Sequence, residues 1–509
     1  MLVIKNLSIY LKKDMKMLIK DFSLSINKND KIAIIGEEGN GKSTLLKAIY
    51  KPELLDYAEI SGSVEKQDEH LAYFAQQEDR LNLSSYDYLH SFILFENFNY
   101  KLYYTLLDDM QINENLISTD IMMHQLSGGE KVKIRLLANL MKEPTVLLLD
   151  EPSNDLDLTT LKWLENFINN LNIPLIFISH DEVLLENCAN GIIHIEQIKG
   201  KSDVRISIHK LSYSDYIKNR QNALDKQLQI SNKEKAEFDA KMDRYRQIYQ
   251  KVEYQQNIIS RQDPAGGRLL KKKMHSIISM GKRFEKEKEN LTERPSYEQG
   301  INLDFDKIVV PKGKRLLDFK LDKLYAGDNL LSKDIYISIF SGEKIGIIGE
   351  NGVGKTTLLK QIIKYLQNNN ISYVYMPQNY NDVMDNSITA IDFLRKDYSK
   401  DELTNIRRYL GSIHFTRNEM LHNISELSSG QKAKLFFAKM TLHNYNLLVL
   451  DEPTRNLSPL SGPEVRKALR EYGGSIISIS HDRKYLEEVC DTLFLLDKKG
   501  IWNISFYDL

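Results

Sequence analysis

The sequence is poor in cysteine, in long apolar runs and in net charge. It has two cysteines in 509 residues, Cys188 and Cys490, and their spacing suits no metal site, which is typical of a protein from a reducing cytoplasm. No run of 18 apolar residues could cross a membrane as a helix. The N-terminal segment is interrupted by lysines and lacks the cleavage site of a signal peptide. We therefore expect a cytoplasmic protein without a membrane partner.

The charges nearly cancel, because 69 lysines and arginines stand against 70 aspartates and glutamates. A formal net charge of -1 excludes a uniformly basic protein, so any affinity for nucleic acid must come from a local patch. The hydrophobic fraction of 42% is ordinary for globular proteins, and 509 residues suffice for two or three domains.

What the sequence does contain is an internal repeat. KIAIIGEEGNGKSTLLK at 31–47 returns as KIGIIGENGVGKTTLLK at 344–360. The blocks LSGGE, LLLDE and ISHD return as LSSGQ, LVLDE and ISHD, each 301 residues later. Blocks repeated in the same order indicate a tandem duplication. We predict a first repeat at 1–215 and a second repeat at 315–509.

Each repeat alternates short apolar runs with helical patterns. Runs such as KIAIIG, TVLLLD and PLIFIS are continuous, which is typical of strands buried on both faces of a parallel sheet. The predicted fold class is α/β, with two similar domains that carry mixed, largely parallel sheets.

The segment between the repeats, 216–314, has almost no strand pattern. Its apolar residues are spaced alternately by 4 and 3 on both sides of Asp263-Pro264 and Gly266-Gly267, which mark a turn. This pattern predicts an antiparallel α-helical hairpin as the linker, and a solvated charged linker is the alternative. The seam residues are Phe238, Met242, Tyr245, Tyr249, Val252, Leu270, Met274, Ile277, Gly281 and Phe284.

Both repeats contain G-x-x-x-x-G-K-[ST] between an apolar strand and a helical segment, which is the context of a phosphate-binding loop, or P-loop. Its glycines allow backbone N–H groups to face the phosphates, and the helix N-terminus adds positive charge. We expect Lys42 and Lys355 to bind the β- and γ-phosphates of ATP, and Ser43 and Thr356 to hold Mg²⁺. The loop residues are Gly36, Glu37, Glu38, Gly39, Asn40, Gly41, Lys42, Ser43 and Thr44, and Gly349, Glu350, Asn351, Gly352, Val353, Gly354, Lys355, Thr356 and Thr357.

An acidic pair follows an apolar strand in each repeat. We expect Asp150 and Asp451 to lie in the Mg²⁺ shell. The adjacent Glu151 and Glu452 are placed to orient and polarise an attacking water as general bases. Simple capping of the strand ends is the alternative.

Together these blocks resemble those of ATP-binding cassette (ABC) ATPases. LSGGE and LSSGQ resemble the signature motif, the acidic pairs the Walker B motif, and the ISHD blocks the segment of the switch histidine. The resemblance covers both repeats and implies an ATP hydrolase. It implies switch histidines at His180 and His481, glutamines that sense Mg²⁺ and the γ-phosphate at Gln76 and Gln378, and aromatic residues that stack on adenine at Tyr10 and Tyr325, although packing is the alternative for Tyr10.

In ABC ATPases two cassettes face each other head to tail, and each ATP lies between the P-loop of one and the signature of the other. The resemblance therefore implies a monomer whose cassettes pair within the chain, and ATP would stabilise the closed pair until hydrolysis. The signature residues are Ser127, Gly128 and Gly129, expected opposite Lys355, and Ser428, Ser429 and Gly430, expected opposite Lys42.

Two departures from the family pattern lie in the second repeat. Ser429 replaces a glycine of the signature, and Ser458-Pro459 stands where the first repeat has Asp157-Leu158. We therefore expect two unequal ATP sites.

Two cassettes with a helical linker between them resemble the ABC-F family of translation factors. The resemblance implies binding near the exit site of the ribosome, with the linker directed toward P-site tRNA and the peptidyl-transferase centre. A fused ATPase subunit of an importer is the alternative, although an importer has no use for a long basic hairpin. DNA-repair relatives insert coiled coils inside a cassette, but only 51 and 50 residues separate the sensing glutamine from the signature here.

Basic residues are concentrated at the predicted tip of the hairpin, near 261–276. Residues 216–293 contain 18 lysines and arginines against 11 acidic residues, and 261–283 alone have a net charge of +6. Ribosomal RNA and tRNA are the expected partners, held through phosphate contacts, whereas a solvated helix usually mixes both signs. The expected RNA-binding residues are Arg261, Arg268, Lys271, Lys272, Lys273, Lys282 and Arg283.

The first repeat has no room for the extra arm of ABC-F members that throttle translation, because its glutamine and signature are only 51 residues apart. Many members that protect the ribosome from antibiotics also lack this arm, which favours drug protection. The short tip favours the alternative, a housekeeping factor that acts on stalled ribosomes.

Overall fold

The computed structural model describes residues 2–13, 15–77, 80–92, 98–198, 203–258, 264–292, 313–397 and 399–506. The chain divides into two compact units, Met1–Tyr213 with Glu298–Leu509, and Ser214–Tyr297. Both repeats belong to the first unit, so the domain boundaries expected at 215 and 315 stay predictions. Within the described residues, no helix is both long enough and apolar enough to traverse a membrane.

A six-stranded sheet forms the centre of the first repeat, in the order β5-β6-β7-β3-β8-β9. All its pairings are parallel except that of β8 with β9. Every residue of β6 and β7 is buried, which confirms the prediction from the continuous apolar runs. The strands are β3 (Lys31–Ile35), β5 (Leu71–Phe74), β6 (Val146–Asp150), β7 (Leu175–Ile178), β8 (Gly191–Ile198) and β9 (Asp203–His209).

An antiparallel sheet and the helices α1 to α6 complete the part of the first repeat that the structure describes. The sheet has the order β2-β1-β4, and its apolar residues share one core with those of β3, β6, β7 and β8. The strands are β1 (Val3–Leu11), β2 (Met17–Ser25) and β4 (Ala58–Glu65), and the helices are α1 (Lys42–Tyr50), α2 (Ser85–His90), α3 (Tyr100–Asp109), α4 (Gly128–Leu140), α5 (Leu158–Asn170) and α6 (Glu182–Cys188).

The second repeat has the same central topology, in the order β13-β14-β15-β12-β16-β17, with β10 and β11 as a separate antiparallel pair. Its strands are β10 (Arg315–Ala326), β11 (Asn329–Phe340), β12 (Lys344–Ile348), β13 (Tyr373–Met376), β14 (Leu447–Asp451), β15 (Ser475–Ile479), β16 (Thr492–Leu496) and β17 (Ile501–Ile504). Its helices are α9 (Lys355–Asn368), α10 (Ala390–Leu394), α11 (Lys400–Ser412), α12 (Arg417–Leu421), α13 (Ser429–Leu442), α14 (Gly462–Glu471) and α15 (Arg483–Val489).

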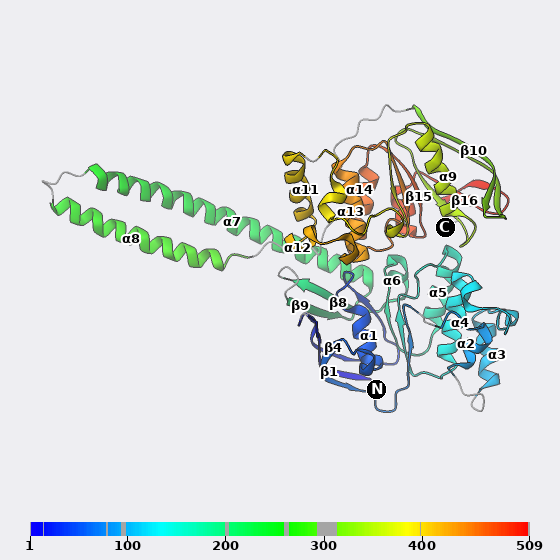
Figure 1. Cartoon of the computed structure of the whole chain (residues 1–509). Coiled ribbons are helices and arrows are strands. Elements are labelled where there is room, and N and C mark those ends of the chain that lie inside the picture. Colours follow the sequence, from blue (N-terminus) through cyan, green and yellow to red (C-terminus); the bar gives the residue numbers. More distant parts are fainter. Residues whose placement is uncertain are drawn as a thin grey trace. The chain divides into compact units, whose positions relative to one another are not determined.

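The predicted hairpin is formed by α7 (Tyr213–Ile258) and α8 (Pro264–Glu289), which lie side by side in Figure 1. Phe284 on α8 makes edge contacts with two rings of α7, at centroid distances of 6.5 Å to Phe238 and 5.9 Å to Tyr245. Val252 and Ile277 are buried along the same seam. These contacts confirm the antiparallel packing expected from the spacing of apolar residues.

The predicted turn is partly wrong. Gly266 and Gly267 lie inside α8, which begins at Pro264. Proline is favoured in the first turn of a helix because its ring already has a helical φ and its missing N–H needs no partner there. Arg261 and Asp263 lie outside the described residues.

Candidate active site

The loops after β3 and β12 have glycine where another residue would be strained. Gly41 and Gly354 directly precede α1 and α9 with φ of 87° and 103°, in the left-handed region that favours glycine. A Cβ at Gly354 would also lie 2.7 Å from Leu331. The unpaired N–H groups of each helix N-terminus therefore face the loop, which suits an anion such as phosphate.

Each P-loop lysine lies across its own loop. Lys42 Nζ donates to the carbonyl oxygens of Gly36 and Glu37 at 2.8 and 2.9 Å. Lys355 Nζ makes the equivalent bonds at 2.6 and 3.0 Å. Burial lowers the pKa of both lysines, although nearby carboxylates act to raise it. The two cations are thus placed beside the helix N-termini in the same way in both repeats.

A hydroxyl and a carboxylate meet at the end of each loop. Ser43 Oγ donates to Asp150 Oδ1 at 2.9 Å, and Thr356 Oγ1 donates to Asp451 Oδ2 at 2.9 Å. Burial raises the pKa of both aspartates. Mg²⁺ prefers oxygen ligands and is usually held by one or two carboxylates together with phosphates, so these residues suit a magnesium ion.

The glutamate after each strand has an unusual backbone. Glu151 and Glu452 have φ of 52° and 55°, a left-handed conformation that is strained for residues other than glycine and clusters at functional sites. Because both repeats have the same strain at the same position, it belongs to the architecture of the site. No residue type in the sequence indicates it.

The carboxylate of Glu151 has three side-chain partners among the described residues. Gln76 Nε2 donates to it at 2.7 Å, Asn154 Nδ2 also donates, and His180 Nε2 lies 3.3 Å from its Oε1 atom. Burial acts to raise the pKa of Glu151, but His180 and the charge of Lys42 outweigh it and hold the pKa at about 2. Asn154 is not among the site residues predicted from the sequence. The signal in the sequence is that Asn154 differs from Arg455, which stands at the equivalent position of the second repeat.

Glu452 has fewer partners. The backbone N–H of His481 donates to it at 3.3 Å, and His481 Nε2 lies 3.9 Å from its Oε1 atom. No hydrogen bond links Gln378 to Glu452 in the described part of the chain. Burial and the charge of Asp451 raise the pKa of Glu452 to about 8. Burial and the charge of Lys355 lower the pKa of His481 to about 4.

Both cavities are built from the two repeats, as the resemblance implied. A cavity of about 640 Å³ is lined by Lys355 and Glu452 and, from the first repeat, by Gly128 and Asp155. Another of about 360 Å³ is lined by Lys42 and Glu151, with Ser429, Arg455 and Asn456 from the second repeat. The P-loop of one repeat thus faces the signature of the other.

The signature segments are fixed by helix capping. Ser127 and Ser428 are the N-caps of α4 and α13 and accept from the backbone N–H of Glu130 and Gln431, whose side chains bond back in capping boxes. The fifth residue of LSGGE and of LSSGQ therefore has a structural role. Gly129 is packed against Thr160 rather than open to the cavity.

Contacts between the P-loops and the opposite repeat differ at one position. Asn351 Nδ2 donates to the carbonyl oxygen of Asp155 at 2.6 Å. The equivalent residue of the first loop is Glu38, and its carboxylate accepts from the backbone N–H of Gly430. The signature N–H of the second repeat is therefore bound to an acidic side chain.

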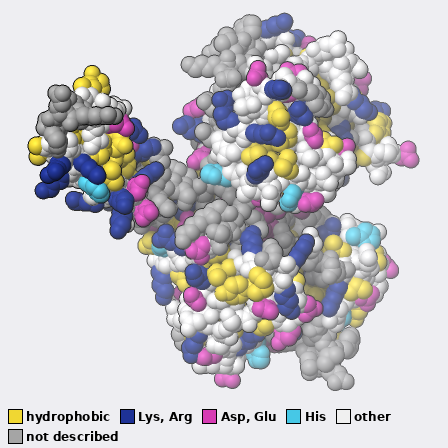
Figure 2. Space-filling view, turned by 60° about the vertical axis from the view of Figure 1, so that its left-hand side comes forward, with side chains coloured by type: hydrophobic (Ala, Val, Ile, Leu, Met, Phe, Trp, Pro, Cys, Tyr) yellow, Lys and Arg dark blue, Asp and Glu magenta, His cyan; other side chains and the backbone are white. Residues whose placement is uncertain are grey.

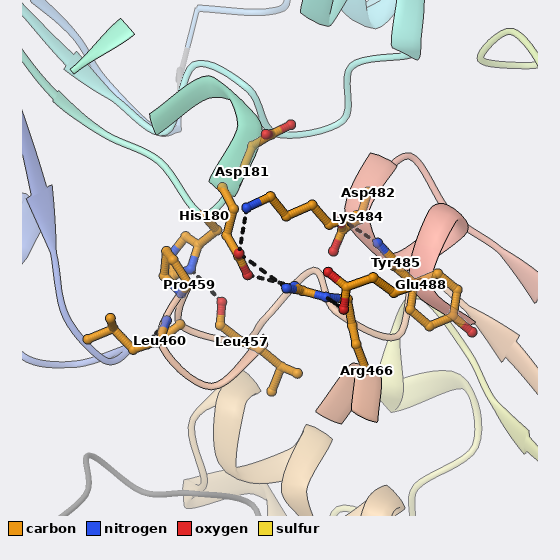
Figure 3. Close-up of polar contacts among 12 residues, drawn as sticks. His180, Asp181, Leu457, Pro459, Leu460, Arg466, Asp482, Lys484, Tyr485 and Glu488 are labelled. Atoms are coloured by element: carbon orange, nitrogen blue, oxygen red, sulfur yellow. Dashed lines mark hydrogen bonds and ion pairs between the residues drawn. The ribbon is translucent and has the colours of Figure 1, made fainter. Parts of the chain in front are cut away.

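The switch histidines also differ. His180 Nδ1 donates to the carbonyl oxygen of Leu457 in the second repeat at 2.7 Å (Figure 3). His481 Nδ1 is buried and has no hydrogen-bond partner within the described residues. The first site is thus linked to the opposite repeat through its histidine, and the second is not.

The two tyrosines expected to stack on adenine do not line these two cavities. Among the described residues that line the cavities, Leu11 and Leu18 are present near Lys42, and Ala326 and Leu331 near Lys355, but Tyr10 and Tyr325 are not. The stacking of Tyr10 and Tyr325 on adenine therefore stays a prediction.

Comparisons with known proteins agree with this geometry. A family model described as "ABC transporter" matches residues 19–154 and 332–455. Similar proteins include the ATP-binding protein Uup of Buchnera aphidicola subsp. Acyrthosiphon pisum (29% identical, 96% of this chain and 79% of that one). They also include the ribosome protection protein VmlR of Bacillus subtilis (28%, 95% and 84%) and ABC transporter F family member 5 of Arabidopsis thaliana (26%, 92% and 71%).

Among solved structures, the archaeal ribosome recycling factor aABCE1, in complex with the ribosomal stalk protein aP1, has the same fold. The TM-score is 0.60 at 16% identity, over 98% of this chain and 90% of that one. The matched residues, the paired P-loops and the relatives lead to one conclusion: the chain is a tandem ABC ATPase and belongs to the ABC-F family.

Proposed function

We propose that this protein is an ATP-driven ribosome-binding factor whose hairpin contacts ribosomal RNA and P-site tRNA near the peptidyl-transferase centre. One observation carries the proposal: α7 and α8 form a two-helix hairpin with basic side chains exposed near its tip, in a chain whose two repeats build composite ATP sites. A relative named as a ribosome protection protein, VmlR, supports it.

In the proposed cycle, Lys42 and Lys355 bind the phosphates, while Ser43 with Asp150, and Thr356 with Asp451, hold Mg²⁺. This ion would neutralise phosphate charge and orient the γ-phosphate. Gln76 and Gln378 sense the ion, and Glu151 and Glu452 orient the attacking water. The γ-phosphate holds the repeats together, and hydrolysis releases them, so ATP turnover times the residence of the hairpin.

The hairpin provides both the charge and the apolar surface for such a partner. Arg268, Lys271, Lys272 and Lys273 are exposed on α8, as are Lys282 and Arg283, and Figure 2 shows lysines and arginines gathered along the hairpin. Cations of this kind suit a phosphate backbone.

Apolar side chains near the same end were not predicted from the sequence. Tyr254, Ile258 and Leu269 are 68%, 61% and 71% exposed. Such side chains suit the unstacked bases of single-stranded RNA, which they can bind by stacking and apolar contact.

The test traps the closed state. The double variant E151Q/E452Q with ATP should sediment with ribosomes in a sucrose gradient, and adding K271E/K272E/K273E should release it. The matched control K226E/K233E/K235E changes three exposed lysines of α7 on the same hairpin by the same total charge and should leave binding within about threefold. A trapped protein that sediments free of ribosomes refutes the proposal, and co-purification with a membrane subunit would instead support the importer.

We further propose protection of the ribosome from antibiotics, which the similarity to VmlR supports. A housekeeping factor that acts on stalled ribosomes is the alternative. Expression in a drug-sensitive host decides between them. Protection predicts better growth on at least one of lincosamides, pleuromutilins, streptogramins A and phenicols, with E151Q/E452Q as the inactive control. No change for any drug leaves the housekeeping role.

A further inference from the structure

Two buried ion pairs join the repeats away from the nucleotide residues. Arg466 on α14 makes a two-pronged contact with Glu182 on α6, from Nη1 to Oε1 at 2.6 Å and from Nη2 to Oε2 at 3.2 Å. Arg483 on α15 pairs with Glu165 on α5. The four side chains are between 3% and 11% exposed. Figure 3 shows the side chain of Arg466 with Lys484 and Glu488 beside it.

These four residues occupy only two positions of the duplicated fold. Glu165 and Arg466 are 301 residues apart, and so are Glu182 and Arg483, which is the constant offset of the repeat. The two contacts are therefore images of each other under the relation that superposes the repeats. Both acids belong to the first repeat and both arginines to the second.

The supporting contacts inside each repeat follow the same division. Asn187 Nδ2 donates to Glu165 Oε2 at 2.9 Å, and Arg466 Nε donates to Glu488 Oε2 at 2.9 Å. Asn187 and Glu488 are again equivalent positions. Each repeat thus provides the kind of partner that its own charged residue requires, a donor for the acid and an acceptor for the arginine.

The division of charge has a consequence for pairing. In a symmetric pair of two first repeats, Glu165 of one copy would face Glu182 of the other, because a two-fold contact places equivalent surfaces opposite each other. In a pair of two second repeats, Arg466 would face Arg483. Both arrangements bring two like charges together in a buried contact, where Asn187 or Glu488 of the same repeat is not enough to replace the lost ion pair, which is strongly unfavourable. Only a first repeat with a second repeat satisfies all four groups.

We infer that Glu165, Glu182, Arg466 and Arg483 form a charge code that directs each repeat to the opposite repeat and excludes association of like repeats. The partner of the acidic face of α5 and α6 is the basic face of α14 and α15. Specificity of this kind needs an unfavourable alternative as well as a favourable contact, and the like-charged pairs provide it. A tandem ATPase with closely similar halves needs such a rule, since both halves carry the same nucleotide-binding surfaces.

A third pair provides a direct readout of the correct contact. Lys484 Nζ lies 2.5 Å from Glu186 Oε1 and 3.4 Å from Glu182 Oε2, and the side chains of Lys484 and Glu186 are partly exposed. A zero-length carbodiimide reagent joins a lysine to a carboxylate only when they touch. A Lys484–Glu186 cross-link, identified by mass spectrometry with ATP present, therefore reports the pairing of the first repeat with the second.

The test uses full-length chains. R466E/R483E makes both repeats acidic, E165R/E182R makes both basic, and each variant should lose the cross-link at least tenfold and remain monomeric in sedimentation. A chain that combines R466E/R483E with E165R/E182R, and that also carries N187E and E488N to exchange the supporting residues, should recover the Lys484–Glu186 cross-link. When the acidic and the basic chains are mixed, they should form a 1:1 dimer with the cross-link between chains.

Three results would overturn the inference. One is a cross-link in R466E/R483E within twofold of the wild type. Another is a mixture that stays monomeric while both chains keep the wild-type thermal unfolding transition. The third result applies if the charge-reversed chains do not fold. The variant R466Q/R483Q removes the positive charges without adding repulsion, so it should give less Lys484–Glu186 cross-link than the wild type. An equal amount of cross-link would reject the charge code.

Discussion

Asn154 and Arg455 occupy equivalent positions in the two repeats, but only the side chain of Asn154 donates a hydrogen bond to the carboxylate of the preceding glutamate. Arg455 turns instead to Asp155 of the first repeat, at 2.7 Å. The carboxylate of Glu151 is thus held by Asn154, Gln76 and His180, whereas among the described residues that of Glu452 has only the contacts of His481. The two ATP sites, expected to be unequal because of the second signature, therefore also differ in the surroundings of their proposed general bases.

Glu151 should be the more active base. A carboxylate with a pKa of about 2 is ionised at neutral pH, while one with a pKa of about 8 is largely protonated and polarises water poorly. We expect E151Q to lower steady-state ATP hydrolysis about 100-fold and E452Q to lower it less than about fivefold. The measurement is phosphate release at saturating ATP.

The neighbours of Glu151 provide the control for this prediction. N154A removes one hydrogen bond without removing the base, so hydrolysis should fall by a smaller factor than in E151Q, about tenfold for roughly 1.4 kcal/mol. Equal losses in E151Q and E452Q would show that the two sites contribute alike.

Stability without nucleotide should depend on pH through Glu452. Its pKa of about 8 in the folded protein is above the ordinary value of 4.5, so the folded state binds more protons between these values. The free energy of unfolding therefore falls as pH rises from 4.5 to 8. E452Q should flatten this fall in urea titrations with EDTA, where each pKa unit is worth about 1.4 kcal/mol.

Glu151 is the matched control for the pH dependence. Its pKa of about 2 is below the ordinary value, so its contribution to stability is complete above pH 4.5 and is lost between 4.5 and 2. E151Q should leave the slope above pH 4.5 unchanged. A slope above this pH that E452Q does not alter would refute the assignment.

Glu38 should weaken ATP binding in the site of Lys42. Its carboxylate accepts a hydrogen bond from the backbone N–H of Gly430, and the resemblance assigns this N–H to the γ-phosphate of ATP. The γ-phosphate must therefore displace the Glu38 carboxylate from Gly430 and then lie beside this negative charge. E38N should tighten binding about fivefold, for about 1 kcal/mol of removed repulsion in a largely hydrated site. The measurement is titration with a fluorescent ATP analogue in a K355A background.

The reciprocal variant is N351E in a K42A background, and it should weaken ATP binding. An affinity of E38N equal to that of its K355A parent would refute the prediction.

Local pattern was enough to predict the fold. Continuous runs such as Val146–Asp150 and the 4–3 spacing around Phe238 and Phe284 follow directly from which faces are buried. Gly266 and Gly267 were misread because glycine favours turns, but a helix tolerates it at a cost of about 1 kcal/mol per residue when Pro264 starts the helix and later residues pack well.

The site was less predictable where it depends on packing between the repeats. Motif spacing indicated Lys42, Asp150 and Glu151. The left-handed backbone of Glu151 and the bond from His180 to Leu457 have no sequence signal. The distance of Tyr10 from its P-loop resembles that of the family, but Leu11 and Leu18 line the cavity near Lys42 and Tyr10 does not.

The hairpin seam offers a test with two glycines of the same helix. A Cβ at Gly281 would lie 2.6 Å from Tyr245 Oη and 3.1 Å from its Cζ, whereas a Cβ at Gly267 would meet nothing within 4 Å. Alanine has the higher helix propensity, so G267A should stabilise α8 by up to about 1 kcal/mol. G281A has the same propensity gain but must displace a ring that is in edge contact with Phe284, at a cost of about 1–3 kcal/mol.

Hydrogen exchange of the α7 and α8 amides should therefore slow in G267A and quicken in G281A. Adding Y245F removes the closest atom and should recover part of the loss, because the two positions are coupled. Equal protection in G267A and G281A would mean that the helices do not pack with Gly281 against Tyr245.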